Sequence, residues 1–438
     1  MKRFIEKDLE SWKNARFRKS LILRGARQVG KTYVVREFAK RFSSFVEINL
    51  ESQPEYREIF DKDLDAKRIA RDISIRKKEK IVPGETLLFI DEIQANPNAV
   101  TALRYFYEDI PELHVIAAGS LLDFAIQKVG IPVGRVESLY LYPMSFLEFL
   151  SVAGNRIIID EVIFNLFKEP ISEVVHKNIL TILGEYLAIG GMPDIVKCWI
   201  EDKDPLRCFA IQHALIDTYR QDFSKYAAKF QIKYVDSVFN SIPEQLGRKF
   251  KYSEIEGDYR KRELSPALDL LVTAGVAHKV FHSPGQGIPI GAGVDPKSYK
   301  VIFLDVALAQ AILGLDLESW FLNPMQQFIN KGEVVEAFVG QELLAYDNPH
   351  AKKHLHYWQR NVPSSTAEVD YLIQKGEKII PIEVKSGAGT TLKSMRIFLE
   401  THTKTPYGIR FSTQNYSKYE NIESLPLYAV ASIFNISA

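Results

Sequence analysis

The sequence has few cysteines, no long apolar run and almost no net charge. Cys198 and Cys208 are the only cysteines among 438 residues, too few for a disulfide framework or a cysteine-based zinc site. No apolar stretch approaches the ~18 residues of a membrane-spanning helix. The N-terminus, MKRFIEKDLESWK, lacks the apolar core of a secretory signal. These absences predict a soluble, cytoplasmic protein with no membrane partner.

The formal net charge of +1 indicates neither an acidic nor a basic partner for the whole chain. The charge is unevenly distributed, because the segment from Lys13 to Arg41 holds ten Lys/Arg residues and one acid, Glu37. Such a local excess can serve phosphate groups. With 46% hydrophobic and 25% charged residues, the composition is that of a globular protein, and the length predicts about three domains.

Residues 20–150 alternate short apolar runs with amphipathic stretches. The runs are SLILRG, FVEINL, TLLFIDE, LHVIAAGS and SLYLYPMS. This pattern predicts an α/β fold with a parallel sheet covered by helices. A mainly helical region follows from about Phe146 and is broken by GGMPD at residues 190–194. We therefore expect four parts: an α/β core at 1–150, a helical lid or linker at 151–228, a third unit at 229–325 and a fourth at 326–438.

The stretch LILRGARQVGKT places a predicted strand directly before a G-x-x-x-x-G-K-[ST] pattern. Glycines allow backbone N–H groups to curl around a phosphate, and the following helix directs its N-terminus at the phosphate. In such a loop the lysine reaches the β and γ phosphates, and the threonine hydroxyl ligates Mg²⁺. The predicted ATP-binding residues are Gly25, Ala26, Arg27, Gln28, Val29, Gly30, Lys31, Thr32 and Tyr33.

TLLFIDEIQ reads as a buried strand that ends in Asp91 and Glu92. We expect Asp91 to join the nucleotide site and to ligate Mg²⁺ with Thr32, and Glu92 to polarise the attacking water. Ser120 follows the next strand, where it can sense the γ-phosphate or simply cap a helix. Arg135 can neutralise transition-state charge, in its own subunit or from a neighbour through self-association of the ATPase domain, or it can be a surface residue.

GARQVGKT, LLFIDEIQ and AAGSLL, followed by VGRVESLYLYPMSFLEFL, resemble the AAA-superfamily ATPase domain of a large prokaryotic family. In that family the ATPase is fused to a C-terminal domain of unknown function. GGMPDIV, KVIFLDVALAQAILG, GEVVEAFVGQELL and PIEVKSG extend the resemblance over nearly the whole chain. The resemblance implies an ATPase that uses ATP and Mg²⁺, and it leaves the biological role open.

Residues 251–281 follow the order helix, helix, strand, which is that of a winged helix-turn-helix, and the family resemblance implies the same. In SPALDLLVTAG we expect Ser265 to cap a helix, Pro266 to be its first residue and Gly275 to end it. The helix has no basic residue between Glu263 and Lys279. Contacts to DNA phosphates are therefore more plausible than base reading, and a purely structural connector is the alternative.

The C-terminal stretch EVDYLIQKGEKIIPIEVKSG reads as a hairpin with its turn at Gly376. Symmetric pairing places Gln374 opposite Ile379 and, further along, Asp370 opposite Glu383, with their side chains on one face. Two opposed carboxylates repel each other unless a cation lies between them, so this face predicts a site for a divalent metal and a water.

Two more residues join this prediction. Lys385 lies on the same face as Glu383, two residues along the strand. In the preceding helix, KGEVVEAFVGQELL, Glu336 falls on the face expected to pack inward, where a carboxylate needs a partner.

The order of a helical Glu, a strand Asp and then Glu-x-Lys resembles the PD-(D/E)XK, or restriction-endonuclease-like, α/β fold, particularly archaeal Holliday-junction resolvases. The resemblance implies that Asp370 and Glu383 ligate Mg²⁺ or Mn²⁺, that Lys385 orients or activates water, and that Glu336 completes the site. One departure is that no proline precedes Asp370. The alternative is an ordinary Lys–Glu ion pair on a solvated sheet face.

Two functions of different classes are the main alternatives from the sequence, and a chaperone-like ATPase that acts without nucleic acid is a third. In the first, Mg²⁺-dependent ATP hydrolysis is coupled to DNA binding or cleavage. In the second, a nucleotide-driven regulatory switch or scaffold uses an inactive nuclease-like domain to dock a partner. Residues 331–438 hold 12 Lys/Arg and 11 Asp/Glu, so this region has no basic excess to hold DNA.

Overall fold

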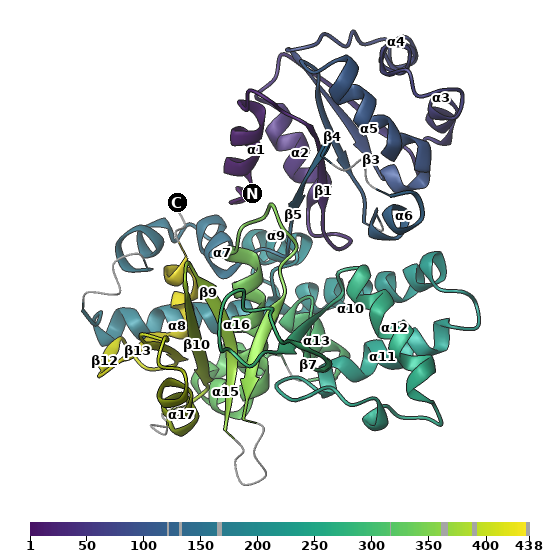
Figure 1. The fold of residues 1–438 in the computed structure, drawn as a ribbon. Coiled ribbons are helices and arrows are strands. Elements are labelled where there is room, and N and C mark those ends of the chain that lie inside the picture. Colours follow the sequence, from purple (N-terminus) through teal and green to yellow (C-terminus); the bar gives the residue numbers. More distant parts are fainter. Residues whose placement is uncertain are drawn as a thin grey trace. The chain divides into compact units, whose positions relative to one another are not determined.

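The computed structural model describes residues 1–120, 122–130, 134–163, 169–315, 317–360, 367–387 and 392–434. The chain forms two compact units (Figure 1). The N-terminal unit is Met1–Tyr142 with the short segments Thr273–Gly275 and Asn348–Lys352. The C-terminal unit comprises Pro143–Val272, Val276–Asp347 and Lys353–Ala438. Among the described helices, none combines the length and the apolar character needed to span a membrane.

Five parallel strands form the sheet of the N-terminal unit, in the order β2-β3-β4-β1-β5. The strand bounds are β1 Ser20–Arg24, β2 Ser44–Asn49, β3 Thr86–Asp91, β4 His114–Ala118 and β5 Val136–Tyr140. The five predicted runs are thus strands of one parallel sheet, as expected for a P-loop nucleotide-binding fold. Because β4 lies between β1 and β3, the carboxyl ends of these three strands meet at one edge of the sheet.

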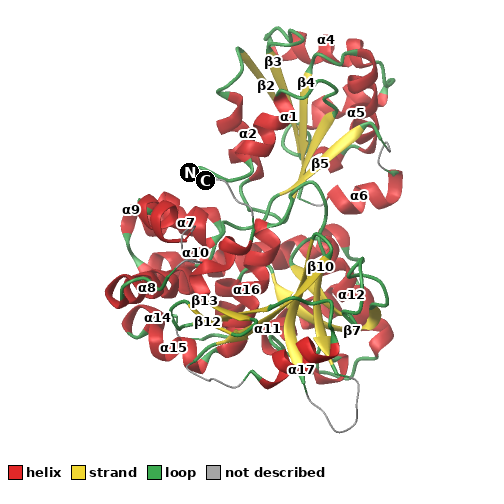
Figure 2. Ribbon diagram, turned by 60° about the vertical axis from the view of Figure 1, so that its left-hand side comes forward, coloured by secondary structure: helices red, strands yellow, loops and turns green. Residues whose placement is uncertain are grey.

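Helices cover both faces of this sheet (Figures 1 and 2). On one face, Ile22, Leu88 and Ala117 belong to a buried apolar cluster that includes residues of α3, α4 and α5. The helix α2 packs on β3 and β4 through its own buried residues, Val34 and Phe38 among them. The helix bounds in this unit are α1 Glu6–Lys13, α2 Lys31–Ala39, α3 Arg57–Asp61, α4 Ala66–Lys77, α5 Pro97–Asp109 and α6 Leu122–Val129, with 3-10 turns at Pro54–Tyr56 and Ile93–Ala95.

The C-terminal unit begins with helices. They are α7 Phe146–Val152, a π-helical turn Ile158–Ile163, α8 Glu173–Ile189, α9 Pro193–Asp202, α10 Pro205–Tyr226, α11 Ile232–Glu244, a 3-10 turn Tyr252–Glu254 and α12 Lys261–Thr273. After the hairpin β6 Ala277–His282 and β7 Asp295–Phe303 come α13 Val306–Ile312, α14 Ser319–Leu322, α15 Pro324–Asn330 and α16 Gly332–Tyr346. The chain continues with β8 Leu355–Gln359, β9 Glu368–Lys375, β10 Lys378–Lys385, α17 Lys393–Thr401, β11 Gly408–Ser412, β12 Ser417–Tyr419, β13 Ile422–Pro426 and a 3-10 segment Leu427–Ile433.

A single eight-stranded sheet runs through this unit in the order β12-β13-β11-β10-β9-β8-β6-β7. The hairpin β6–β7 pairs antiparallel within itself, and β6 pairs parallel with β8. The strands expected in the third predicted part of the chain therefore extend the sheet of the fourth. This pairing satisfies one edge of the hairpin and leaves β7 as an outer strand.

The turn GGMPD is anchored by Asp305 of the motif FLDVALAQ. Asp305 is fully buried, and its carboxylate accepts N–H groups from Gly191 at 2.7 Å and from Ala307 and Leu308 at 3.0 and 3.1 Å. Gly190 has φ +79°, and a Cβ there would lie 2.3 Å from the Asp305 carboxylate. Asp305 therefore caps α13 and anchors the turn before α9, which is a structural role.

A second buried acid joins α16 to α7. The Glu342 carboxylate accepts the N–H of Phe146 at 3.1 and 3.2 Å, and the Tyr346 hydroxyl accepts the N–H of Leu147 at 3.1 Å. These contacts satisfy the free N–H groups at the start of α7. Burial raises the pKa of Glu342 to about 8, despite hydrogen bonds that lower it.

The expected start of α12 is wrong by about one turn. The helix begins at Lys261, because the Glu263 carboxylate accepts the N–H of Arg260 at 2.8 Å and fixes the first turn there. Ser265 is therefore not the cap, and Pro266 lies inside the helix. Gly275, with φ +74°, follows the end of the helix as predicted.

Candidate nucleotide site and acidic cluster

Two glycines shape the loop between β1 and α2. Gly25 has φ +147°, and a Cβ there would lie 2.2 Å from the carbonyl oxygen of Leu141. Gly30 precedes α2 with φ +95°. Both positions exclude ordinary side chains, so the glycine spacing in the sequence corresponds to a real backbone requirement.

Arg3 supports this loop and was not predicted. Its guanidinium is buried and donates to the carbonyl oxygens of Val29 at 2.9 Å and Tyr142 at 2.8 Å. Both partners are backbone atoms distant along the chain, so no local sequence pattern marks this residue. Arg3 ties the N-terminus to the loop that follows β1.

Lys31 lies in the curve of the loop. Its ammonium donates to the carbonyl oxygens of Gly25 at 3.0 Å and Ala26 at 2.7 Å. Burial lowers the pKa of Lys31 to about 8, and the carboxylates of Glu92 and Asp91 partly offset this shift. An anion bound in the loop would be a stronger partner for this ammonium than two neutral carbonyl groups.

Thr32 and Asp91 meet at the carboxyl edge of the sheet. The Thr32 hydroxyl donates to Asp91 Oδ2 at 3.0 Å, and the amide of Asn49, at the end of β2, donates to the same oxygen at 3.3 Å. Burial, and then the charge of Glu92, raise the pKa of Asp91. The predicted pair is therefore assembled, and Asn49 is a neighbour that the sequence did not single out.

Glu92 is held by Gln94. Glu92 has φ +49°, an uncommon backbone conformation for a glutamate, and its Oε2 accepts the Gln94 amide N–H at 2.5 Å. A Cβ at Gly119 would lie 2.0 Å from Gln94 Oε1, so the amide rests directly on this glycine. Gln94 and Gly119 are therefore supports for Glu92 that sequence reasoning missed, although Gln94 lies within the motif IDEIQ.

The remaining predicted residues of this site lie at the same edge. Ser120 is buried just beyond the end of β4, between the strands that carry the loop and Asp91. Arg27 is half-buried, Gln28 is exposed with φ +62°, and Tyr33 is 39% exposed in the first turn of α2. Nine of these residues thus form one continuous loop and helix start, with Ser120 close by in the topology.

Arg135 lies at the amino ends of the strands, whereas the nucleotide site lies at their carboxyl ends. It directly precedes β5, whose Val136 pairs with Ser20 at the start of β1, whereas Tyr140 pairs with Arg24 next to the loop. The two ends of β5 are four residues apart, which corresponds to about 13 Å. Arg135 forms an exposed ion pair with Glu108 at 2.7 Å. The structure does not bring Arg135 to the nucleotide site of its own chain, and a role in a neighbouring subunit stays a prediction.

In the C-terminal unit, a tyrosine fixes α16 against β9. The Tyr371 hydroxyl donates to the carbonyl oxygen of Glu336 at 2.8 Å. A Cβ at Gly340 would lie 2.4 Å from the same hydroxyl, so glycine is needed for this approach. The contact brings Glu336 beside Asp370, the neighbour of Tyr371 in β9.

Lys300 of β7 occupies the centre of this acidic group. Its Nζ lies 2.9 Å from Glu336, 2.5 Å from Glu368 and 3.8 Å from Asp370. The Lys300 side chain is 3% exposed, and its ammonium lies 5.3 Å from the ring centre of Tyr357. The three carboxylates and Lys300 are called the acidic cluster below. In the sequence, a lysine within the apolar run SYKVIF is the one feature that could have indicated this cluster.

The hairpin β9–β10 has the predicted register near its turn. Gln374 pairs with Ile379, and the pairing continues to Tyr371 and Ile382. Beyond that point the Asp370 carboxylate accepts the backbone N–H of Val384 at 2.7 Å. Asp370 is therefore bound to the backbone of β10 as well as facing Lys300.

Glu383 and Lys385 form an ion pair of 2.7 Å. The other carboxylate oxygen of Glu383, Oε2, is buried and has no hydrogen-bond partner among the described residues. Burial raises the pKa of Glu383, and Lys385 opposes this shift. The predicted pair exists, and the backbone N–H of Met395 also lowers the pKa of this carboxyl group.

The charges in the acidic cluster depend on each other. Burial raises the pKa of Glu336 to about 8, and the Lys300 ammonium partly offsets this shift. Burial by itself lowers the pKa of Lys300, but the charges of Glu336, Asp370 and Glu368 outweigh it, so the pKa lies above its ordinary value. Lys300 is therefore a permanent cation.

This arrangement does not fit the divalent metal expected at Glu336, Asp370 and Glu383. Within the described ranges, no three His, Cys, Asp or Glu side chains are grouped so that they could hold a metal ion. Lys300 contacts two of the expected ligands, and Lys385 contacts the third. The Lys300 ammonium thus takes the position between Glu336 and Asp370 in which Mg²⁺ or Mn²⁺ was expected.

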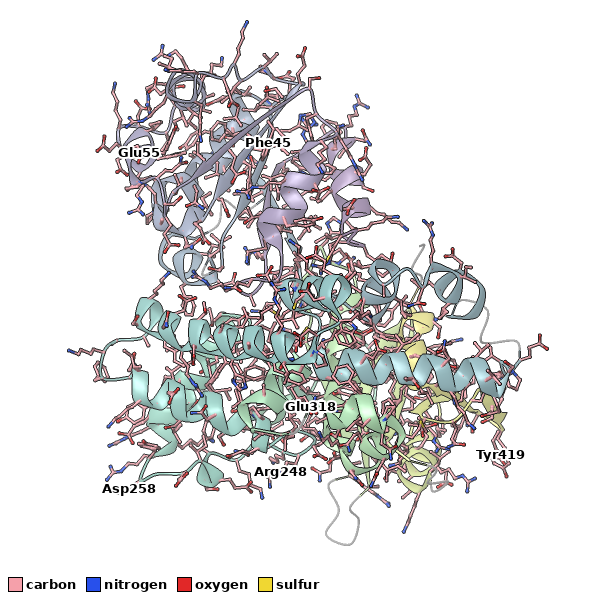
Figure 3. All side chains as sticks on the ribbon, turned by 180° about the vertical axis from the view of Figure 1, so that it is seen from behind. Phe45, Glu55, Arg248, Asp258, Glu318 and Tyr419 are labelled. Atoms are coloured by element: carbon pink, nitrogen blue, oxygen red, sulfur yellow. The ribbon has the colours of Figure 1, made fainter. Side chains whose placement is uncertain are left out.

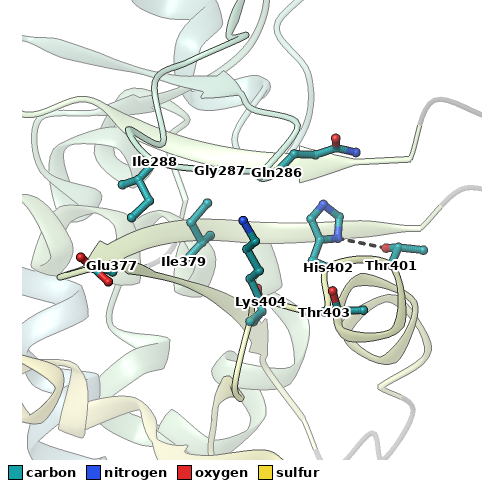
Figure 4. A pocket seen from close by; sticks show the side chains of 11 residues that line it. Gln286, Gly287, Ile288, Glu377, Ile379, Thr401, His402, Thr403 and Lys404 are labelled. Carbon is teal, nitrogen blue, oxygen red and sulfur yellow. Dashed lines mark hydrogen bonds between the residues drawn. The ribbon is translucent and has the colours of Figure 1, made fainter.

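A pocket of about 580 Å³ opens elsewhere on the C-terminal unit (Figure 4). It is bounded by the loop around Gln286, the start of β10 and the segment after α17, with Lys404 projecting between them. His402 is buried there, with Nε2 at 2.8 Å from the carbonyl oxygen of Pro284. No predicted site residue lines this pocket.

The basic segment before α12 lies at the surface, and Arg248 and Asp258 mark it in Figure 3. Arg248 forms an ion pair of 3.0 Å with Glu254. The exposed residues of α12 are Lys261 and Arg262 in its first turn and, further along, Pro266 and Asp269, and Asp269 binds Lys279 at 2.6 Å. Beyond its first turn this helix therefore presents no array of donors for base edges.

Comparison with protein families identifies three regions. Residues 17–150 match a family model described as an AAA domain. Residues 180–319 and 331–430 match two domains of unknown function, DUF8612 and DUF4143. The N-terminal unit therefore contains an AAA-type P-loop ATPase domain, whereas the regions that follow it have no assigned function. No curated protein matches the chain significantly.

Solved structures resemble the chain only loosely. A Walker-type ATPase of Pyrococcus abyssi is 14% identical with a TM-score of 0.45, over 70% of this chain and 94% of that one. The ORC1 protein of Aeropyrum pernix in complex with DNA is 13% identical with a TM-score of 0.29, over 71% and 90%. RuvB of Thermotoga maritima is 13% identical with a TM-score of 0.32, over 63% and 88%. These scores are too low to support an argument about function.

Proposed function

We propose that the N-terminal unit binds and hydrolyses Mg·ATP. The observation that carries the proposal is the assembly of Lys31, Thr32, Asp91 and Glu92 at one edge of a parallel sheet. The loop between Gly25 and Gly30 and the N-terminus of α2 supply backbone N–H groups for the phosphates. Lys31 supplies a buried positive charge for the β and γ phosphates.

The residues at this edge fit a magnesium ion. Thr32 and Asp91 place a hydroxyl and a carboxylate oxygen 3.0 Å apart, and hard oxygen ligands of this kind suit Mg²⁺. Bound there, Mg²⁺ would neutralise phosphate charge during transfer. Glu92, held by Gln94, would accept a hydrogen bond from the attacking water and orient it towards the γ-phosphate. Ser120 lies where a hydroxyl can contact the γ-phosphate.

The test uses Lys31→Ala with Lys40→Ala as a matched control. Lys40 directly follows α2, is exposed, and pairs with Glu37 at 2.8 Å. Removal of the Lys31 ammonium should lower kcat/KM for ATP at least about 100-fold, the size expected for loss of one electrostatic contact to the transition state. The Lys40 variant should behave like the wild type. Equal ATP binding and turnover by Lys31→Ala and wild type would reject the proposal.

Self-association is the second part of this proposal. Arg135 can act on nucleotide only from a neighbouring subunit, because it lies at the far edge of its own sheet. If it does so, Arg135→Ala should lower kcat, and the activity per chain of the wild type should rise with protein concentration. A kcat that is independent of concentration and unchanged in Arg135→Ala would assign this residue to the surface.

For the C-terminal unit we propose a nuclease-like fold that serves as a regulatory or docking module. A specific observation favours this over cleavage: Lys300 contacts two of the acids expected in the metal site, Glu336 and Asp370. The hairpin β9–β10, the strand β11 and helix α16 carry the residues on which the nuclease resemblance rests. Branched and linear DNA should remain intact with Mg²⁺ or Mn²⁺, in the wild type and in Glu383→Ala alike. Cleavage by the wild type that Glu383→Ala abolishes would favour the nuclease.

DNA binding without cleavage is a separate proposal for residues 229–325. The elements α11, α12 and the hairpin β6–β7 support a winged-helix arrangement, and the exposed basic residues Arg260, Lys261 and Arg262 favour phosphate contacts. Changing these three residues to alanine should weaken binding of any DNA sequence and make it less dependent on salt. The same affinity and salt dependence in the triple variant would make this unit a structural connector.

A further inference from the structure

The acidic cluster raises a physical question, because three acidic side chains converge in a largely buried place. Glu336 and Asp370 are 15% and 16% exposed, Glu368 is 30% exposed, and Lys300 is 3% exposed. Buried like charges repel strongly unless a cation lies among them. The fold brings that cation from β7, a strand outside the segment that contains the acids.

Several carboxylates surround Nζ of Lys300, as they would surround a bound cation. A single Nζ approaches carboxylates from two elements, Glu336 from α16 and Glu368 from β9, at 2.9 and 2.5 Å, with Asp370 at 3.8 Å. A surface lysine would extend into water, but this side chain is enclosed and lies beside the ring of Tyr357. The ammonium therefore occupies an enclosed position that is lined by carboxylates.

The neighbouring acid Glu383 has other partners. It pairs with Lys385 at 2.7 Å, and the backbone N–H of Met395 lowers its pKa. Around Lys300 itself, carboxylates of Glu336, Glu368 and Asp370 approach one point from two elements. Oxygens of this kind suit divalent cations, and the position among them is held by a lysine of the same chain.

We propose that Lys300 is a built-in replacement for a divalent metal, and that the acidic cluster becomes a metal-binding site only when Lys300 is removed. The lysine fixes β7 to α16 and β9 and keeps the site closed to Mg²⁺ and Mn²⁺. This inference deepens the proposal of a non-cleaving C-terminal unit, on which it rests. It is independent of ATP hydrolysis by the N-terminal unit.

The test measures Mn²⁺ binding by electron paramagnetic resonance on the full chain without nucleotide. The wild type should bind no Mn²⁺ that depends on Asp370, whereas Lys300→Met should gain one ion per chain. Adding Asp370→Asn to Lys300→Met should remove the gained ion. The matched control is Lys279→Met in the adjacent strand β6, where the lysine pairs with Asp269 outside the cluster, and it should gain no ion.

Thermal unfolding provides a second readout. Without metal, Lys300→Met should unfold at least about 5 °C below the wild type, because the largely buried acids of the cluster lose their cation. Mn²⁺ should restore much of this loss in Lys300→Met and should not shift the wild type. The double variant Lys300→Met/Glu368→Gln removes the lysine together with the carboxylate that lies 2.5 Å from it, and it should recover part of the loss without metal.

Two results would overturn the inference. The first is Mn²⁺ binding by the wild type that Asp370→Asn abolishes, since the lysine would then not exclude the metal. The second is a Lys300→Met protein that neither binds Mn²⁺ nor is rescued by Glu368→Gln, since Lys300 would then act through packing alone. Loss of ATP turnover in any of these variants bears on the N-terminal proposal and not on this one. A folded Lys300→Met that gains the ion supports the inference.

Discussion

The contact between Gln94 and Glu92 allows a quantitative prediction for ATP hydrolysis. Replacing Gln94 by Ala removes the amide that donates to the Glu92 carboxylate at 2.5 Å. A hydrogen bond to a charged group contributes about 1.5–3 kcal/mol. If this energy holds Glu92 in the orientation that polarises water, its loss should lower kcat about 10- to 150-fold.

The assay must separate binding from turnover. Gln94 does not contact the loop, Lys31 or Thr32 in any described hydrogen bond, so the affinity for ATP should change less than about threefold, or ~0.7 kcal/mol. Phosphate release at saturating ATP gives kcat, and a fluorescent ATP analogue gives the affinity. Gln94→Glu places a carboxylate beside Glu92 and should lower kcat at least as much as Gln94→Ala.

Gly119→Ala tests the same contact from the other side. A Cβ at Gly119 would lie 2.0 Å from Gln94 Oε1 and would push the amide away. This variant should therefore lose kcat in the same direction as Gln94→Ala, and the double variant should lose little more than either single one. A kcat within twofold of the wild type for Gln94→Ala would refute this role of Gln94.

Three further predictions concern pH. Lys31 has its pKa lowered to about 8 in the free protein. Above pH 8 the ammonium is lost, so the Kd for ATP, measured by fluorescence titration, should rise up to about tenfold per pH unit. A Kd that does not change with pH would contradict this. Glu342 has a pKa of about 8 when folded, above its unfolded value, so it stabilises the C-terminal unit at low pH and this stability is lost as pH rises towards 8. This group makes the free energy of unfolding fall by about 1.4 kcal/mol per pH unit. In urea unfolding at several pH values, Glu342→Gln should lack this dependence. Burial lowers the pKa of His114 to about 4, so the N-terminal unit should lose stability as pH falls from about 6.5 towards 4, and His114→Phe should unfold with less acid dependence in the same experiment.

The nucleotide site could be predicted from sequence because its chemistry is local. The glycine spacing, Lys31 and Thr32 lie within eight residues, and Asp91 ends a strand that is apolar throughout. Parallel strands place their carboxyl ends together, so the meeting of Thr32 and Asp91 followed from the pattern of strands. Gln94 and Arg3 were missed because their roles depend on side-chain contacts that no spacing rule encodes.

The C-terminal site was predicted less completely. The turn at Gly376 fixed the register of the hairpin near it, and Gln374 faces Ile379 as expected. Lys300 was not anticipated because it is 36 residues before Glu336 and was assigned to a different part of the chain. No sequence pattern indicates that β6 pairs with β8 and merges two predicted parts into one sheet.

Arg135 illustrates a limit of motif reading. An arginine in VGRVES was a candidate for neutralising transition-state charge, but its position along the chain does not specify at which end of the strands it lies. The pairing of Val136 with Ser20 places it at the amino edge, far from the loop. Only the direction of β5 decides this point, and that direction depends on tertiary structure.

The central claim, ATP hydrolysis by the N-terminal unit with Glu92 acting on water, is tested most directly by single-turnover hydrolysis in Glu92→Gln. The variant keeps the shape of the side chain and leaves Lys31, Thr32 and Asp91 in place. It should bind ATP with nearly the affinity of the wild type and hydrolyse it about 100- to 10,000-fold more slowly. Hydrolysis by Glu92→Gln at the rate of the wild type would contradict the account.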